Sequence, residues 1–131
     1  MAQTYRILIL EDEPLILMDL EYAALDRDCT VHCASSCSEA LDLLAADAAI
    51  DIAVLDVSLG KNSTCLPVAQ ALTEFGIPYL LHSGDLDRHD ETIRTLEAQL
   101  IAKPAPAEKV IAAAIVCAEG QDPTAIRIAA E

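Results

Sequence analysis

Five short, almost continuously apolar segments recur along this chain of 131 residues. They lie at residues 6–10, 30–34, 52–55, 78–82 and 100–102. Apolar runs of this length, without polar alternation, are typical of parallel strands that are covered on both faces. Because the intervening segments show helical spacing, the sequence predicts an α/β fold with a doubly wound, five-stranded parallel sheet, right-handed crossovers and five helices.

The predicted helices have recognisable starts and stops. Pro14 suits a first helical turn, Ser36 or Ser38 a helix N-cap, and Gly76 a helix end. The segment at 87–98 is the weakest, because only Ile93 and Leu96 give it an apolar stripe, and we expect it to be the least firmly packed. The clearer stripes comprise Leu15, Met18, Tyr22 and Leu25; Ala40, Leu43 and Leu44; Val68, Ala71, Leu72 and Phe75; and Val110, Ile111, Ala114 and Ile115.

The net charge and the length of the chain argue against nucleic-acid binding, membrane binding and a separate output domain. The chain has 22 acidic against 8 basic residues and a net charge of -14, which repels nucleic-acid phosphates and anionic lipid surfaces. We expect one domain at residues 1–118, a short tail at 119–131 and no output domain. No signal peptide or membrane-spanning run is evident, so we expect a cytoplasmic protein that binds neither nucleic acid nor membrane.

The cysteines and histidines carry little predictive weight. The cysteine count is odd and no CxxC pair occurs, so we interpret Cys29, Cys33, Cys37, Cys65 and Cys117 as buried thiols of a cytosolic protein. Cys33 and Cys37 lie near His32, but the two tight ligand pairs of a structural zinc site are missing. We interpret His32, His82 and His89 as ordinary core or surface residues, with His82 inside the fourth strand.

Polar residues stand where the apolar runs end. Glu11 and Asp12 follow the first run, and Asp56, Ser83 and Lys103 follow the third, fourth and fifth. Parallel strands end on one edge, and in the flavodoxin-like order 2-1-3-4-5 the first and third strands flank the switch point where ligands bind. Clustered carboxylates there require a cation, and an all-oxygen ligand set that leaves room for water suits Mg²⁺.

This residue set matches aspartate phosphorylation. With Mg²⁺ to offset carboxylate repulsion, one aspartate can attack phosphorus and become an aspartyl phosphate. Lys103 can pair with Asp56 at rest and then with a phosphoryl oxygen, while the Ser83 hydroxyl donates to another. Each residue alone also fits a solvated turn or a surface charge, but their joint placement at strand ends favours a site.

The chain resembles the receiver domains of two-component response regulators over residues 5–118. The resemblance rests on Glu11-Asp12, Asp56, Ser83-Gly84 and Lys103-Pro104. It implies that Asp56 is the phosphoacceptor, that Glu11, Asp12, Asp56 and the backbone carbonyl of Ser58 hold Mg²⁺, and that Ser83 and Lys103 contact the phosphate. It also implies a cis bond before Pro104. The stretches 56–60, 67–69, 76–78 and 83–84 resemble more specifically the small single-domain receivers of alphaproteobacteria.

One position departs from the family. Many receivers carry an aromatic residue three positions before the lysine, and its ring turns inward on activation. This chain has Leu100 there, so the usual aromatic rotation is not available. The route from Ser83 to the surface formed by residues 87–102 therefore stays open, and one interpretation is that Leu100 and Ile101 present an apolar docking patch.

Three rival functions fit part of this residue pattern. A phosphatase of the haloacid dehalogenase type needs an acidic residue two positions after its nucleophile, where this chain has Ser58. A flavodoxin needs a phosphate-binding loop, which Glu11-Asp12-Glu13 would repel, and aromatic residues make up only 3% of the chain. A receiver-like module that binds partners without phosphorylation remains the alternative.

The favoured function is a phosphoacceptor that serves a histidine kinase or a histidine phosphotransferase. The resemblance implies that its phosphorylation changes contacts with an unknown target protein, or moves or removes phosphoryl groups. We do not expect an enzyme that acts on a separate substrate.

Overall fold

A computed structural model describes residues 4–46, 49–59, 64–84, 96 and 98–120. It contains a five-stranded sheet in the order β2-β1-β3-β4-β5, in which every pair is parallel, so the predicted topology is confirmed. The strands are β1 Arg6–Leu10, β2 Thr30–Ala34, β3 Ile52–Asp56, β4 Tyr79–Ser83 and β5 Leu100–Ala102.

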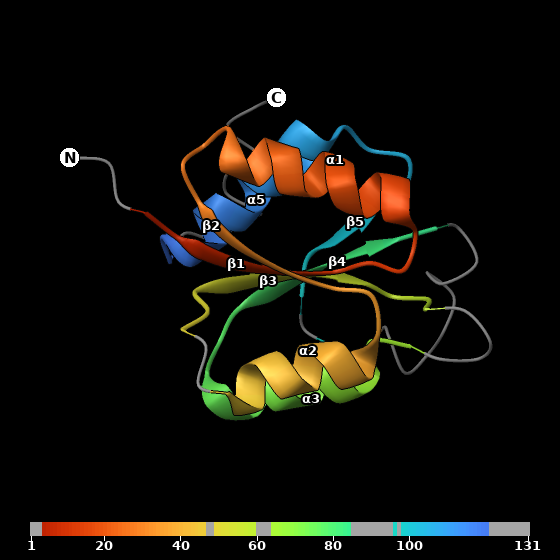
Figure 1. Cartoon of the computed structure of the whole chain (residues 1–131), viewed down its shortest axis with the longest axis vertical. Coiled ribbons are helices and arrows are strands. Elements are labelled where there is room, and N and C mark those ends of the chain that lie inside the picture. The colour runs from red at the N-terminus through yellow and green to blue at the C-terminus, as the bar shows by residue number, and fades with distance from the viewer. Residues whose placement is uncertain (1–3, 47–48, 60–63, 85–95, 97, 121–131) are drawn as a thin grey trace.

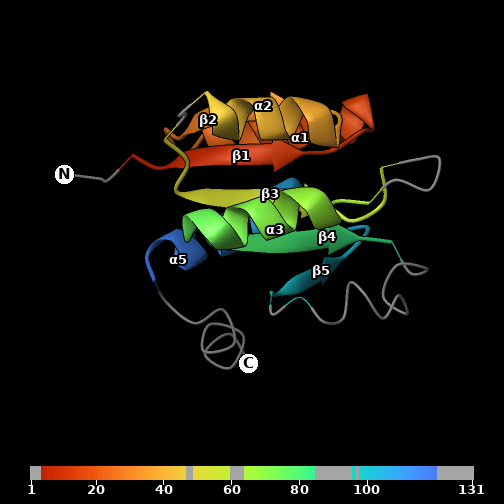
Figure 2. The same ribbon diagram turned by 90° about the horizontal axis from the view of Figure 1, so that it is seen from below.

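Helices cover both faces of the sheet (Figure 1). Helices α1 (Pro14–Leu25) and α5 (Ala107–Ala118) lie on one face, and α2 (Cys37–Ala45) and α3 (Leu66–Phe75) lie on the other. In the turned view of Figure 2, α2 and α3 lie in front of the sheet, toward the viewer. The helix predicted at 87–98 falls almost wholly outside the described residues.

The predicted helix boundaries are borne out by local chemistry. Helix α1 begins at Pro14, whose missing N–H would have no intrahelical partner in the first turn. The Glu39 backbone N–H donates to Ser36 Oγ at 3.2 Å, so Ser36 rather than Ser38 caps α2. Helix α3 ends at Gly76, which has a left-handed φ of 73° that most other residues would adopt only with strain.

The predicted buried face of α1 was wrong. Leu15 is 71% exposed, and Met18, Tyr22 and Leu25 are also exposed. The buried residues are Leu20, Ala23 and Ala24. Helix α1 is apolar on most of its circumference, so its spacing offered more than one stripe. Small alanines suit the face that approaches the sheet and α5 closely, and this packing selects it.

The core consists of two apolar clusters, one on each face of the sheet. The cluster on the α2/α3 side includes Leu8, Leu10, Leu55, Leu72 and Leu81. The cluster on the α1/α5 side includes Ile7, Ile9, Val54, Leu80 and Ile111. Successive strand residues thus alternate between faces, so the central strands need apolar residues at nearly every position.

Edge strands are less covered than the sequence predicted. Strand β5 is half-buried at all its positions and β2 at most of them, whereas β3 is buried throughout. An edge strand has a neighbour on only one side, so complete burial was too strong an expectation there.

No helix in the described part of the chain is long and apolar enough to cross a membrane.

Candidate functional site

The five key side chains come from four strand ends at one edge of the sheet. Glu11 and Asp12 directly follow β1, Asp56 ends β3, Ser83 ends β4, and Lys103 directly follows β5. The register pairs Leu10 with Leu55 and Ser83 with Ala102, so these ends are level. The predicted convergence at the carboxyl edge is therefore confirmed.

Three carboxylates form a compact acidic cluster at this edge. Oxygens of Glu11, Asp12 and Asp56 all lie within 4.8 Å of one another. Glu11 is 1% and Asp56 3% exposed, whereas Asp12 is accessible to solvent. The Glu13 backbone N–H donates to Glu11 Oε2 at 3.2 Å and helps to orient that side chain. Two buried oxygen donors with a third open to water fit a hard divalent cation such as Mg²⁺.

Lys103 spans the buried part of the cluster. Its Nζ lies 3.0 Å from Glu11 Oε1 and 3.2 Å from Asp56 Oδ1. The Lys103 backbone N–H donates to the Ser83 carbonyl at 2.7 Å, which ties the lysine to the end of β4. The bond between Lys103 and Pro104 is cis, as the family resemblance implied. One ammonium thus bridges two carboxylates that come from different strands.

The cluster carries more negative charge than Lys103 compensates. Burial, and then hydrogen bonding and repulsion from Glu11, raise the pKa of Asp56 to about 8, and Lys103 counteracts only part of this rise. Burial would lower the pKa of Lys103, but Glu11 and Asp56 outweigh it and raise that pKa. Lys103 therefore stays charged, and the arrangement favours a further positive charge beside Asp56.

Ser83 and Ser58 complete the predicted set. Ser83 is fully buried, and its Oγ has no hydrogen-bond partner among the described residues, so its hydroxyl can donate to an oxygen that enters the site. Ser58 forms an isolated antiparallel bridge with Thr64 shortly after Asp56. The role implied for the Ser58 carbonyl stays a prediction.

His82 is a buried residue of the fourth strand, as the sequence predicted. It lies in β4 as predicted and is 3% exposed, yet neither ring nitrogen has a hydrogen-bond partner within the described part of the chain. The register places it opposite Asp56. Residues two apart in a strand lie on the same face of the sheet. Val54 and Leu80 pack on the α1/α5 side, so strand alternation places Asp56 and His82 on that side as well.

Of the five cysteines, Cys29 and Cys65 are buried as expected, whereas Cys33, Cys37 and Cys117 are only partly buried. The Cys37 thiol donates to the Thr64 carbonyl at 3.1 Å. Burial, together with Glu21, raises the pKa of Cys33 to about 11, so its reactive thiolate form is scarce at neutral pH.

Solved structures resemble this chain over most of its length. The solution structure of SdrG from Sphingomonas melonis Fr1 is 32% identical, with 91% of this chain and 99% of that one covered and a TM-score of 0.73. A response regulator receiver protein from Sinorhizobium medicae WSM419 is 23% identical over 92% and 98% of the two chains, with a TM-score of 0.78. The receiver domain of the Erythrobacter litoralis response regulator PhyR is 24% identical over 89% and 91%, with a TM-score of 0.74.

The sequence matches no protein-family model and no curated protein sequence. The structural similarities nevertheless agree with the fold and with the strand order of the sheet. The chain therefore belongs to the response regulator receiver domain family.

Proposed function

We propose that this protein is a phosphoacceptor of a two-component phosphorelay, and that Asp56 receives the phosphoryl group in a Mg²⁺-dependent reaction. The observation that carries the proposal is the contact of Lys103 Nζ with both Glu11 and Asp56 inside a cluster of three carboxylates. This contact supports the proposal because it joins a carboxylate that could attack phosphorus, oxygens that could hold a metal ion, and an ammonium group that could pair with the product.

Glu11, Asp12 and Asp56, with the Ser58 carbonyl, would hold Mg²⁺. When bound, the ion supplies positive charge that reduces repulsion between the carboxylates and an incoming phosphoryl group. One Asp56 oxygen forms a bond to phosphorus as the P–N bond of a donor phosphohistidine breaks, and the imidazole leaves with its electron pair and takes up a proton. Lys103 then pairs with a phosphoryl oxygen, and the Ser83 hydroxyl donates to another.

The phosphoryl donor in this proposal is a histidine kinase or a histidine phosphotransferase. Phosphorylation adds nearly two negative charges at a strongly acidic edge, and this change alters contacts with a target protein or moves or removes phosphoryl groups. Leu100 packs against the cluster on the α2/α3 side, so any movement there is that of an aliphatic side chain. We propose that the protein acts in the cytoplasm as a signalling module, without a separate substrate, nucleic acid or membrane.

Intact-mass spectrometry after incubation with acetyl phosphate tests the proposal. The wild type is expected to gain one phosphoryl group with Mg²⁺ and none in EDTA. Asp56→Asn is expected to gain none under either condition, because an amide oxygen is not a competent nucleophile. Hydroxylamine should remove the group from the wild type, because it cleaves acyl phosphates.

Asp42→Asn is the matched control, because Asp42 is an exposed aspartate of α2, away from the strand ends. This variant should be phosphorylated as the wild type is. Phosphorylation that persists in Asp56→Asn would show that another residue is the phosphoacceptor. No phosphorylation of folded wild type, with acetyl phosphate or a phosphorylated histidine kinase, would favour the constitutive interaction module.

A further inference from the structure

Helix α1 carries a stripe of large apolar side chains on its solvent-exposed side. The stripe consists of Leu15, Met18, Tyr22 and Leu25, each at least 40% exposed. Their spacing of three, four and three residues places all four on one face of the helix. Among the described residues, Phe75 in α3 is the one other large apolar side chain that is exposed. Exposed apolar side chains thus gather on α1, and such a patch indicates a contact surface.

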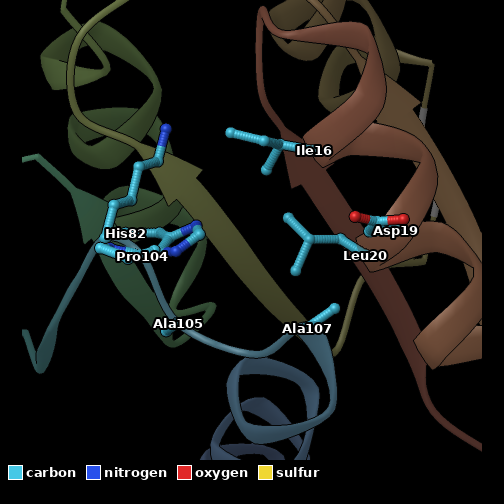
Figure 3. Close-up of a pocket in the computed structure, with 8 residues that line it drawn as sticks. Ile16, Asp19, Leu20, His82, Pro104, Ala105 and Ala107 are labelled. Carbon is cyan, nitrogen blue, oxygen red and sulfur yellow. The ribbon is translucent and has the colours of Figure 1, made fainter.

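The opposite side of α1 is already packed. Leu20, Ala23 and Ala24 are buried in the cluster that this helix shares with the sheet and α5. In Figure 3, Ile16 and Leu20 point from α1 toward the cavity between this helix, β4 and α5. Tyr22 lies about 160° around the helix from Leu20, so the stripe faces away from the molecule. No element in the described part of the chain covers it.

Charge argues against a second copy of the chain as the cover. Asp19 and Asp26 are exposed on α1 beside the stripe, and the whole chain has a net charge of -14. Two stripes packed against each other would bring like-charged carboxylates together. An apolar segment with a positive charge fits this surface better.

The chain itself has a segment of this kind after α5. Residues 121–131 lie outside the described residues, and their central part, 125–130, reads Ala-Ile-Arg-Ile-Ala-Ala. This part contains one positive charge, that of Arg127, and no negative charge. Its composition therefore complements an apolar stripe that is flanked by Asp19 and Asp26.

The segment starts close enough to reach the stripe. Helices α1 and α5 pack against each other, and both end at the amino edge of the parallel sheet, α1 at Leu25 and α5 at Ala118. The axes of packed helices are about 8–10 Å apart. The six residues from Gly120, the last described residue, to Ile126 can span up to about 20 Å. This length is enough to pass from the end of α5 to the outer side of α1.

The two isoleucines also match the spacing of the stripe. In an extended segment Ile126 and Ile128 point to the same side, about 6.6 Å apart. Met18 and Tyr22 are four residues apart in α1, which corresponds to a rise of about 6 Å. Each isoleucine can therefore contact one of these two side chains.

We propose that residues 121–131 fold back over α1 and cover the apolar stripe, with Ile126 and Ile128 against Met18 and Tyr22. The segment is then an internal cover that another protein must displace to reach this face of α1. The contact does not involve the acidic cluster and is measured without Mg²⁺ or a phosphodonor. Failure of this proposal and failure of the proposed phosphorylation are therefore separate results.

The first test is NOE spectroscopy of full-length protein with isotope-labelled isoleucine and methionine methyl groups and tyrosine rings. We expect NOEs from the Ile126 and Ile128 methyl groups to the Met18 methyl group and the Tyr22 ring. An isotope-filtered experiment on mixed labelled and unlabelled chains should show no such NOE between chains, because the contact lies within one chain.

Two variants of exposed residues locate the contact. Tyr22→Ser should remove the NOEs and move the Ile126 and Ile128 methyl signals toward those of an unstructured chain. Phe75→Ser is the matched control, because Phe75 is similarly exposed but lies on a helix of the opposite face, and it should leave these signals unchanged.

Three results would overturn the proposal. The first is an absence of NOEs between the two isoleucines and α1 in the wild type. The second is a set of NOEs that occurs only between chains, which would make a second copy the cover. The third is an equal response of the isoleucine signals to Tyr22→Ser and Phe75→Ser.

Discussion

The α2/α3 side of the core and the acidic cluster at the strand ends are both buried, but they affect stability in opposite ways. On the α2/α3 side, apolar residues such as Leu10, Leu55 and Leu72 are fully removed from water. In the acidic cluster, Glu11 and Asp56 are almost as deeply buried, but both are acidic, and their ionised forms repel each other. Burial stabilises the first region and raises the free energy of the second.

This difference separates folding from chemistry. The apolar cluster holds the strands in register, and that register brings the carboxylates within 4.8 Å. Part of the resulting stability offsets the unfavourable burial of these carboxylates, which in the proposed function include the nucleophile and the metal ligands. Substitutions in the two regions should therefore change stability with opposite signs.

Leu72→Ala should give the largest loss of stability. Leu72 is 0% exposed in α3, and its truncation leaves a cavity in the core, so we expect the free energy of unfolding to fall by about 3 kcal/mol. Urea denaturation measures the change. Phe75→Ala is the matched control, because Phe75 is 61% exposed on the same helix and should change stability by less than about 0.5 kcal/mol. Equal losses would show that the described packing of α3 is wrong.

Asp56→Asn should stabilise the metal-free protein at alkaline pH. The pKa of Asp56 is raised from 3.8 to about 8 in the folded protein, so the unfolded chain releases this proton at lower pH. The wild type therefore loses stability as the pH rises from about 4 to about 8. The asparagine variant lacks this loss. After allowance for solvent screening, we expect its advantage to grow by on the order of 2 kcal/mol between pH 5 and pH 9.

Denaturation in EDTA at several pH values measures the advantage of Asp56→Asn. The exposed control Asp42→Asn should show no such growth. An advantage that does not change with pH would contradict the electrostatic account of the acidic cluster.

Mg²⁺ should stabilise the wild type more than it stabilises Asp56→Asn. An ion that binds only the folded state adds about 1.4 kcal/mol at ten times its dissociation constant. The variant loses one of the three clustered carboxylates, so its gain should be clearly smaller at the same concentration. Thermal unfolding with and without MgCl₂ measures both gains, and NaCl at equal ionic strength controls for screening. Equal gains would place the ion elsewhere.

Most of the fold was predictable because strand burial leaves a strong local pattern. Runs such as residues 52–55 favour central strands in a chain that alternates strands and helices, and the convergence of Glu11, Asp56 and Lys103 then follows from parallel geometry. The state of these groups was not predictable, because the raised pKa of Asp56 depends on how closely Glu11 approaches and how well water is excluded. The lack of a hydrogen-bond partner for the His82 imidazole among the described residues likewise depends on its neighbours in space.

Helix orientation was the main failure, and a small expected effect tests its correction. The sequence allowed α1 to bury Leu15, whereas the structure leaves this side chain 71% exposed and buries Leu20 instead. Leu15→Ser should therefore change the free energy of unfolding by less than about 0.5 kcal/mol. Leu20→Ser should cost several times more, because it places a hydroxyl in the apolar cluster beneath α1. Urea denaturation of the two variants side by side gives the comparison, and a larger loss for Leu15→Ser would restore the stripe that the spacing suggested.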